Sequence, residues 1–227
     1  MKRALPFLII IAVLIGAVVI AWYLKESGTQ QTPAPPGPTV STSATPVRVT
    51  ELGAEPPHAI GEANAPVTLE EYGDFQCPPC GLFHPILKQM ESEFGAKLRV
   101  VFRQYPLVPA HAHALSAARA AEAAGMQGKF WPMHDLLYEN QSIWKDEFDV
   151  RTIFEGFATK IGLDLEKYRR DLTSQTVEQR IFLDGKRARA LGVKGTPTVF
   201  LNGREVPFES LPAEKLRVLI QNEIGNK

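Results

Sequence analysis

The stretch EEYGDFQCPPCGLFHPIL, residues 70–87, holds both cysteines of the chain, Cys77 and Cys80. Two prolines separate them, and hydrophobic residues recur at helical spacing in the run that follows. The residues before the motif are β-branched and aromatic, which predicts a buried strand over 65–75 and a helix from Cys77 that stops at Gly95. The two thiols therefore stand at a predicted strand-to-helix junction.

The flanking sequence completes an α/β pattern. A second strand is predicted over 97–107, and strand, helix and strand in this order form a βαβ unit with a parallel sheet. From about 108 to 191 the pattern is helical throughout. Two short strands over 196–206 follow, joined by the hairpin signal at Asn202 and Gly203, and a last helix starts near Pro212. The sheet must be assembled from distant segments, with an all-helical subdomain inserted between them.

The N-terminus determines the expected compartment. After Lys2 and Arg3, an uncharged apolar run of roughly 20 residues extends to Tyr23, which is the length that a helix needs to cross a bilayer. Trp22 and Tyr23 suit the membrane interface, and the two cations should stay cytoplasmic. An uncleaved anchor over 1–25 is favoured over a cleaved signal peptide, whose apolar region is usually shorter and ends in a small-residue cleavage site. In both cases the rest of the chain is exported, where a disulfide persists.

Composition sets further bounds. Residues 26–57 are rich in Pro, Thr, Ser and Gly and predict a linker, so the folded domain is expected over 58–225. Lys+Arg and Asp+Glu balance at 25 each, which gives no reason to expect a nucleic-acid partner. Two cysteines are too few for a disulfide framework or a four-thiolate zinc site. They form one bridge, a reactive pair, or part of a mixed metal site.

These features carry a resemblance. The CPPC motif at the strand-to-helix junction, the sequence GTPTVFLNG (195–203) and the helices between them resemble the exported DsbA-like thiol–disulfide oxidoreductases. The resemblance extends over residues 58–225. It implies a thioredoxin-like α/β fold with the inserted helical subdomain, preceded here by the transmembrane helix and linker. It also implies an enzyme that needs no cofactor beyond the redox-active pair Cys77–Cys80.

The chemistry of the motif follows from its position. Free N–H groups and the positive end of the helix dipole favour the thiolate of Cys77, while Cys80, one turn on and deeper, is expected to resolve mixed disulfides. Pro78 and Pro79 suit a first helical turn and hold the sulfurs at bridging distance. The strongly oxidising relatives have His where Pro79 stands, and prolines remove backbone donors. We therefore expect a Cys77 pKa above the roughly 3.5 of DsbA, nearer about 7, and a weaker oxidant.

The resemblance implies roles for three further residues. Glu71 matches the place where thioredoxin-fold oxidoreductases bury an acid beneath the second cysteine, and a buried carboxyl could accept and return the proton of Cys80. Glu70 and Glu71 must point to opposite faces of the strand, and we favour Glu71 as the buried one over the alternative that it faces solvent. Thr196 and Pro197 are expected to form a cis peptide that packs against the disulfide and exposes backbone for extended substrate.

A metal site is the other use to which the thiols could be put. Its ligands would come from Cys77, Cys80, His84, His111 and His113. Pro197 beside the sulfurs would obstruct a metal ion, so no metal is predicted. His111, His113 and His134 are instead expected to cap or pack at helix ends, and residues 185–192 to form a solvated helix face.

The predicted function is extracytoplasmic thiol–disulfide exchange with exported proteins, run as an oxidase and recycled by a membrane redox partner. The predicted location is the inner or plasma membrane, single-pass, with a monomeric domain on the periplasmic side. Two alternatives stay open: a reductase or isomerase fed by a membrane electron donor, and a non-catalytic chaperone or metal-handling module. A Cys77→Ser variant separates these classes, because a catalyst loses exchange whereas a holdase keeps suppressing aggregation.

Overall fold

The computed structural model describes residues 52–226. The predicted membrane anchor, and most of the predicted linker, lie outside the described residues. Among residues 52–226, no helix has the length and apolar character that spanning a membrane requires.

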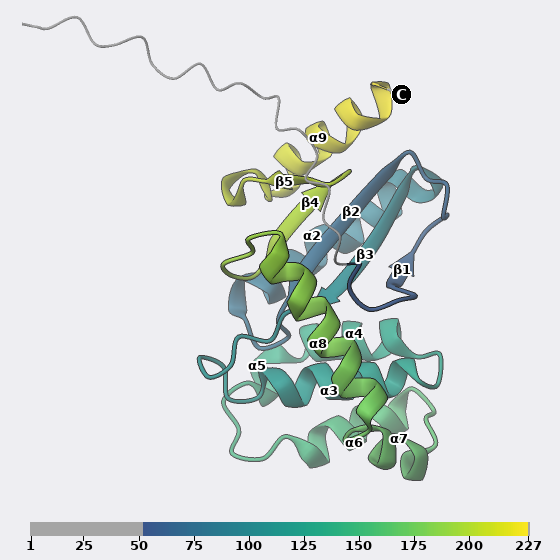
Figure 1. Ribbon diagram of the computed structural model, residues 1–227, viewed down its shortest axis with the longest axis vertical. Helices are drawn as coiled ribbons and strands as arrows, with labels where there is room; N and C mark the ends of the chain where they lie inside the picture. The colour runs from purple at the N-terminus through teal and green to yellow at the C-terminus, as the bar shows by residue number, and fades with distance from the viewer. Residues whose placement is uncertain (1–51, 227) are drawn as a thin grey trace, which may run out of the picture. The chain divides into compact units, whose positions relative to one another are not determined.

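A five-stranded sheet in the order β1-β3-β2-β4-β5 runs through the domain (Figure 1). Strands β2 and β3 are parallel, as the predicted βαβ unit requires, and the other three pairings are antiparallel. The strands are β1 (His58–Ile60), β2 (Val67–Gly73), β3 (Leu98–Gln104), β4 (Thr198–Leu201) and β5 (Arg204–Val206). The sequence pattern did not indicate β1, because three half-buried residues are too few to show alternation.

Two helices cover one face of the sheet. Helix α2 (Pro78–Phe94) crosses from β2 to β3, and α9 (Ala213–Gly225) packs beside it over a shared apolar core. The predicted hairpin between β4 and β5 is confirmed, since Asn202 and Gly203 take φ values of 47° and 79°. Two consecutive positive φ angles are what a two-residue hairpin turn of this type requires. The resulting fold is the thioredoxin-like α/β arrangement that the resemblance implied.

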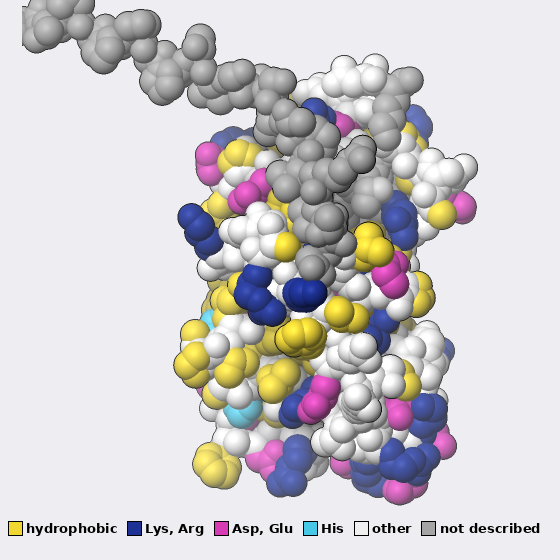
Figure 2. Space-filling view, in the orientation of Figure 1, with side chains coloured by type: hydrophobic (Ala, Val, Ile, Leu, Met, Phe, Trp, Pro, Cys, Tyr) yellow, Lys and Arg dark blue, Asp and Glu magenta, His cyan; other side chains and the backbone are white. Residues whose placement is uncertain are grey.

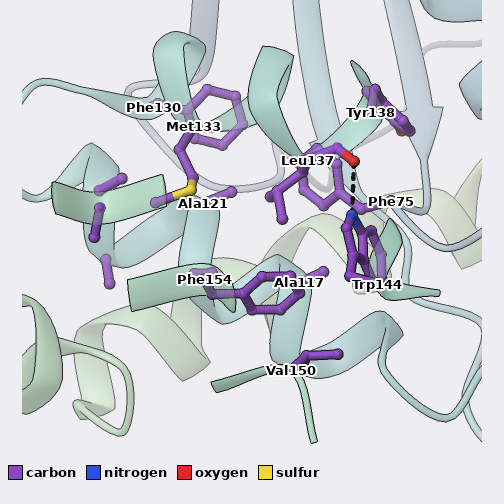
Figure 3. Packing of buried hydrophobic residues seen from close by; sticks show 14 of the residues in the cluster. Phe75, Ala117, Ala121, Phe130, Met133, Leu137, Tyr138, Trp144, Val150 and Phe154 are labelled. Atoms are coloured by element: carbon purple, nitrogen blue, oxygen red, sulfur yellow. Dashed lines mark hydrogen bonds between the residues drawn. The ribbon is translucent and has the colours of Figure 1, made fainter. Parts of the chain in front are cut away.

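The predicted helical subdomain is confirmed between β3 and β4. Alanines of its first helix, including Ala117 and Ala121, let the large side chains of neighbouring helices approach closely, as Figure 3 shows for Met133 and Phe154. Trp144 is fully buried and its Nε1 donates to the carbonyl of Leu137 at 2.8 Å. The helices are α3 (Ala114–Gly125), α4 (Phe130–Glu139), α5 (Gln141–Trp144), α6 (Arg151–Lys160), α7 (Leu165–Asp171) and α8 (Gln175–Ala190). This apolar cluster also contains both cysteines, so the insert and the thiols share one core.

An ion pair holds α8, the last helix of the insert, against the sheet. Arg187 on α8 donates to both carboxylate oxygens of Glu70 at 3.0 and 2.9 Å, and Ala188 is fully buried. The prediction of a solvated face over 185–192 was therefore wrong for its inner side. Its arginines suggested solvent in the sequence, but one of them has a half-buried carboxylate partner on β2.

The segment just before His58 packs onto the domain. Ala54 is fully buried, its N–H donates to Asp184 at 2.8 Å, and its carbonyl accepts from Arg103 at 2.6 Å. Residues that composition assigned to the end of the linker thus belong to the fold. The signal was absent from the sequence because the partners of Ala54 lie far along the chain.

Candidate active site

The two cysteines occupy the first turn of α2. Cys77 is the residue before the helix, with φ −69° and ψ 119°, and Pro78 occupies its first position. The missing N–H groups of Pro78 and Pro79 fall where an α-helix has no acceptor for them. Cys77 is 5% exposed and Cys80 is fully enclosed, and both thiols are free in this structure. A reagent from solvent can therefore reach only the first sulfur.

The environment of Cys77 favours its thiolate. Hydrogen bonds from the Cys80 thiol, from Thr196 and from the Cys80 backbone outweigh the effect of burial and lower the Cys77 pKa to about 6. Because neither proline carries an N–H, Cys80 supplies the first backbone donor of the helix. This value lies between the roughly 3.5 of DsbA and the roughly 7 of thioredoxin.

Cys80 is perturbed in the opposite direction. Burial raises its pKa well above the ordinary value, and its hydrogen bond to Cys77 and the neighbouring charge of Glu71 add to the effect. At neutral pH the pair therefore consists of a thiolate at Cys77, which keeps a small exposed area, and a fully enclosed thiol at Cys80. When the surroundings of two thiols shift their pKa values in opposite directions, the two thiols have different chemical roles.

The strand places Glu70 and Glu71 on opposite faces, as predicted. Glu71 is 1% exposed, its Oε1 has no hydrogen-bond partner among residues 52–226, and burial with the charges of Cys77 and Glu91 raises its pKa to about 8. Burial would also raise the pKa of Glu70, but the guanidinium groups of Arg187 and Arg103 lower it below the ordinary value. Glu71 thus holds a proton at neutral pH within the electrostatic reach of Cys80.

The loop before β4 lies against the thiols. The peptide between Thr196 and Pro197 is cis, which confirms that prediction. The carbonyl oxygen of Thr196 accepts a hydrogen bond from the Cys77 thiol at 3.2 Å. The Thr196 hydroxyl is buried; among the described residues it has no partner while the Cys77 thiol donates to the carbonyl, and the hydrogen bond that lowers the Cys77 pKa is one to the thiolate. The hydroxyl is available to the Cys77 thiolate, which charges and discharges during exchange.

The loop that carries the motif is fixed by side chains that the sequence pattern did not indicate. Asp74 Oδ1 accepts from the backbone of Gln76 at 2.8 Å, and its Oδ2 accepts from Leu107 at 2.9 Å. Gln141 on α5 donates to the carbonyls of Phe75 and Cys77 at 2.7 and 2.9 Å. The contact between the Asp74 side chain and the N–H two residues on is an Asx-turn, for which Asp is a typical first residue. No local signal marks Gln141, because its acceptors come from another part of the fold.

An apolar groove of about 480 Å³ opens beside the motif. Leu82 on α2 and Phe208 after β5 rim it and are 74% and 63% exposed. Exposed apolar side chains of this size beside a reactive group indicate a binding surface. The lining residues are Pro79, Leu82, Phe83, Ile86, Pro197, Phe208, Glu209, Leu211 and Pro212.

Further apolar side chains are exposed on α5 and in loops near it. Val108, Ile143 and Phe148 are each more than half exposed. Figure 2 shows hydrophobic side chains gathered over the region of α5, whereas charged side chains dominate the end formed by α6 and α7. The apolar surface is thus concentrated toward the end of the insert that contacts the motif.

The histidines do not complete a metal site with the cysteines. His111 Nδ1 lies 2.7 Å from Asp74 Oδ2, and His113 Nε2 lies 2.6 Å from the carbonyl of Glu147. His134 was predicted at a helix end, but it lies inside α4 and is 1% exposed, where burial lowers its pKa to about 4. An apolar helix face explains this position better than capping does.

A different group of residues could in principle hold an ion. The ligand atoms of His84, His134 and Asp135 all lie within 4.8 Å of one another. Asp135 Oδ1 is 3.1 Å from His84 and 2.9 Å from His134, and Lys88 lies 3.3 Å from its other oxygen. Three potential donors, one of them an ammonium, therefore already surround the carboxylate. This arrangement accounts for the cluster through hydrogen bonds alone.

Solved structures share this architecture. The oxidised form of BdbD from Bacillus subtilis is 22% identical, with a TM-score of 0.67 over 74% of this chain and 93% of that one. α-DsbA1 from Wolbachia pipientis is 19% identical, with a TM-score of 0.65 over 77% and 94%. A thioredoxin-like oxidoreductase from Silicibacter pomeroyi is 25% identical, with a TM-score of 0.58 over 72% and 90%. The likeness to BdbD and α-DsbA1 is one of fold.

Sequence comparison gives two results: a much longer relative that this chain matches in part, and a family whose model matches most of this chain. A Na⁺/H⁺ antiporter, NhaA 1 from Salinispora arenicola, is 43% identical over 147 residues, which are 65% of this chain but only 22% of that protein. The chain thus spans about a quarter or less of the length of such relatives. A family model described as thioredoxin matches residues 54–222, which include the whole sheet and the entire helical insert. The chain therefore belongs to the thioredoxin family, and it shares its fold with BdbD and α-DsbA1.

Proposed function

We propose that this chain is a membrane-anchored, extracytoplasmic thiol–disulfide oxidoreductase that oxidises exported proteins through Cys77 and Cys80. The observation that carries the proposal is the opposite perturbation of two thiols within one helical turn. Cys77 is held toward the thiolate and reaches the surface, whereas Cys80 is enclosed and held toward the thiol. A permanent structural disulfide has no need of either feature.

Exchange begins from the Cys77–Cys80 disulfide. A substrate thiolate attacks Cys77 Sγ, so a bond forms between these two sulfurs and the bond between the two cysteines breaks. Cys80 leaves as a thiolate with the electron pair of that bond. Glu71, protonated at neutral pH with a pKa of about 8, supplies the proton that this thiolate takes up.

The mixed disulfide is then resolved in favour of the substrate. A second substrate thiolate attacks the substrate sulfur, and the new disulfide leaves with the substrate. Cys77 departs as a thiolate, which is a good leaving group because its pKa is about 6. Two electrons now reside on the enzyme as the Cys77 thiolate and the Cys80 thiol. A membrane redox partner must accept them before the next turnover.

The groove supports an unfolded protein as the substrate. Its lining is almost wholly apolar and includes Pro79 and Pro197, the two prolines that adjoin the cysteines. An extended segment with hydrophobic side chains could lie there while its cysteine reaches Cys77. Folded proteins hide such side chains, so the groove favours substrates that have not completed folding.

A reductase or isomerase is the second candidate, because the two-proline spacer leaves the Cys77 thiolate less stabilised than the thiolate of DsbA. At pH 7, lowering the pKa of Cys77 from 9.0 to about 6 raises the reduction potential by at most about 30 mV. A thiolate like that of DsbA, with a pKa of about 3.5, would raise it by about 100 mV. The expected potential therefore lies about 70 mV below that of DsbA, near −190 mV on the scale where DsbA is about −120 mV.

The reduction potential, measured by equilibration with glutathione buffers, tests the proposal. A reduction potential between about −120 and −200 mV supports an oxidase, and a potential of about −270 mV supports a reductase instead. Cys77→Ser should abolish exchange with a reduced, unfolded substrate. If that variant suppresses aggregation of the substrate as well as the parent protein does, and the parent shows no exchange, the chaperone alternative replaces both.

The compartment is part of the proposal and needs its own test. Lys2 and Arg3 before an apolar run support a single-pass anchor with the domain on the outer side. A thiol reagent that cannot cross membranes should label Cys77 in intact spheroplasts after reduction. Labelling only after lysis would refute the outer location. The sodium–proton exchange named for the antiporter relatives is not proposed here, since this chain matches 22% of such a protein.

A further inference from the structure

Tyr138 is a buried polar residue near the cysteines that the exchange mechanism leaves unused. This residue of α4 is 5% exposed, and its hydroxyl is buried without a hydrogen-bond partner among residues 52–226. Leaving a buried hydroxyl unpaired is unfavourable, so such a group calls for an explanation. The ring is held firmly, because it packs 4.9 Å from Phe75 and 5.4 Å from His84 between ring centroids (Figure 3).

The hydroxyl is directed at the strand beneath the cysteines. A Cβ atom built on Gly73 would lie only 2.9 Å from the Tyr138 oxygen, so the absence of a side chain there makes room for it. Gly73 is two residues after Glu71 and presents the same face of β2. Tyr138 and Cys80 belong to one buried cluster, and Glu71 is buried on the face of β2 toward which the hydroxyl points.

Titratable groups surround this space on several elements. Glu71 contributes from β2, Asp74 from the loop after it, and His134 from α4 itself. Cys77 contributes from the position just before α2, and Cys80 and His84 contribute from α2 itself. Burial raises the pKa of Tyr138 well above its ordinary value, and the nearby charge with the largest further effect is that of Cys80. The hydroxyl therefore keeps its proton throughout the reaction and can donate a hydrogen bond.

We propose that the Tyr138 hydroxyl is a catalytic hydrogen-bond donor to the Cys80 thiolate at the moment when the Cys77–Cys80 disulfide opens. The inference rests on the proposed function. When a thiolate attacks Cys77, the electron pair of the broken bond goes to Cys80 Sγ, which is enclosed by apolar side chains. Tyr138 solvates this charge until the proton of Glu71 reaches the sulfur. In the finished dithiol Cys80 is neutral, and the hydroxyl is again without a partner.

The role predicts a change in rate without a change in equilibrium. Tyr138→Phe keeps the packed ring and removes only the donor. Reduction of the Cys77–Cys80 disulfide by dithiothreitol, followed by stopped-flow fluorescence on the full chain in mild detergent, should be about tenfold slower. Reoxidation by oxidised glutathione should slow by the same factor. The reduction potential should stay the same, since Cys80 carries no charge in either end state at neutral pH.

Tyr168→Phe is the matched control. Tyr168 on α7 is also fully buried with an unpartnered hydroxyl, and the charge that acts on it is Glu155 rather than a cysteine. Its substitution should leave both rates unchanged. Equal rates for Tyr138→Phe and the parent would overturn the proposal, as would a slower reduction balanced by a shifted potential. Tyr138→Phe could instead shift the pH profile of the reduction rate and leave the rate at pH 6 unchanged. That result would mean that the hydroxyl acts on Glu71 rather than on Cys80, and it too would overturn the proposal.

These measurements separate the inference from the proposed function. Dithiothreitol and glutathione react with the disulfide whether or not the chain acts on exported proteins. If the parent fails to oxidise any protein substrate and Tyr138→Phe still slows opening of the disulfide, the proposed function fails and the role of Tyr138 stands. If the parent oxidises substrates and the variant does so equally fast, the reverse holds.

Discussion

Replacing Glu71 with Gln should make the protein more stable, and the gain should grow with pH. Gln is nearly isosteric but cannot ionise. The Glu71 carboxyl has an ordinary pKa of 4.5 when the chain is unfolded and about 8 when it is buried in the fold. The folded state therefore binds a proton that the unfolded state has released anywhere between these values.

The sign and size follow from proton linkage. Because the folded pKa is the higher one, the parent has its full stability below pH 4.5, loses it as pH rises, and reaches a constant lower level above about pH 8. The loss is about 1.4 kcal/mol per pH unit within this window. Between pH 5 and pH 8 it amounts to about 3.5 kcal/mol, a large part of the 5–15 kcal/mol that stabilises a typical domain.

Urea unfolding at pH 5, 6, 7 and 8, with the thiols kept reduced, measures the effect. The difference in the free energy of unfolding between Glu71→Gln and the parent should rise steadily over this series. Glu70→Gln is the control on the same strand. Its arginine partners lower the pKa of Glu70, so the stability it contributes is already complete above pH 4.5 and is lost only at lower pH. Its difference from the parent should be destabilising and flat from pH 5 to 8. A flat difference for Glu71→Gln would refute the buried, proton-holding role.

Three further outcomes are expected. The reduction potential should fall by about 59 mV per pH unit below pH 6 and by about 30 mV above it, because the dithiol then binds one proton fewer, and a single slope from pH 4 to 8 would contradict a Cys77 pKa of about 6. Thr196→Val should raise the Cys77 pKa by about one unit, read from thiolate absorbance, since the thiolate loses a hydroxyl donor; an unchanged value would assign that hydroxyl no part in exchange. Leu82→Asp should raise the KM for an unfolded protein substrate about tenfold and leave the reaction with glutathione unchanged, whereas an equal loss with both would locate substrate binding outside the groove.

Local patterns predicted most of the fold. Helical and strand periods marked β2, α2, β3 and α9, and the Asn202–Gly203 signal marked the hairpin. The strand alternation required Glu70 and Glu71 to face opposite sides, and this geometry is what the structure has. These features depend on neighbouring residues, so a single sequence contains them.

Features that depend on distant residues were not predictable in this way. Gln141 and Tyr138 lie in an ordinary helical pattern, and their significance comes only from contacts with the loop and strand around the cysteines. The docking of Ala54 needs Arg103 and Asp184, which no local rule connects. Arg187 was misassigned for the same reason. A charged side chain is expected in water unless the fold supplies a counterion.

The chemistry of the site also depends on the pairing register of β2. Its pairing aligns Glu71 with Phe102 on one side and with Val199 on the other. A slip of one position would exchange the two faces, bringing Glu70 under the thiols and turning Glu71 toward the arginines. Composition, charge and hydrophobicity at the site would be almost unaltered by that exchange. An insertion or deletion of one residue between Gly61 and Val67 could shift the loop harmlessly, whereas the same change inside the strand would alter which acid serves the cysteines and which one holds α8.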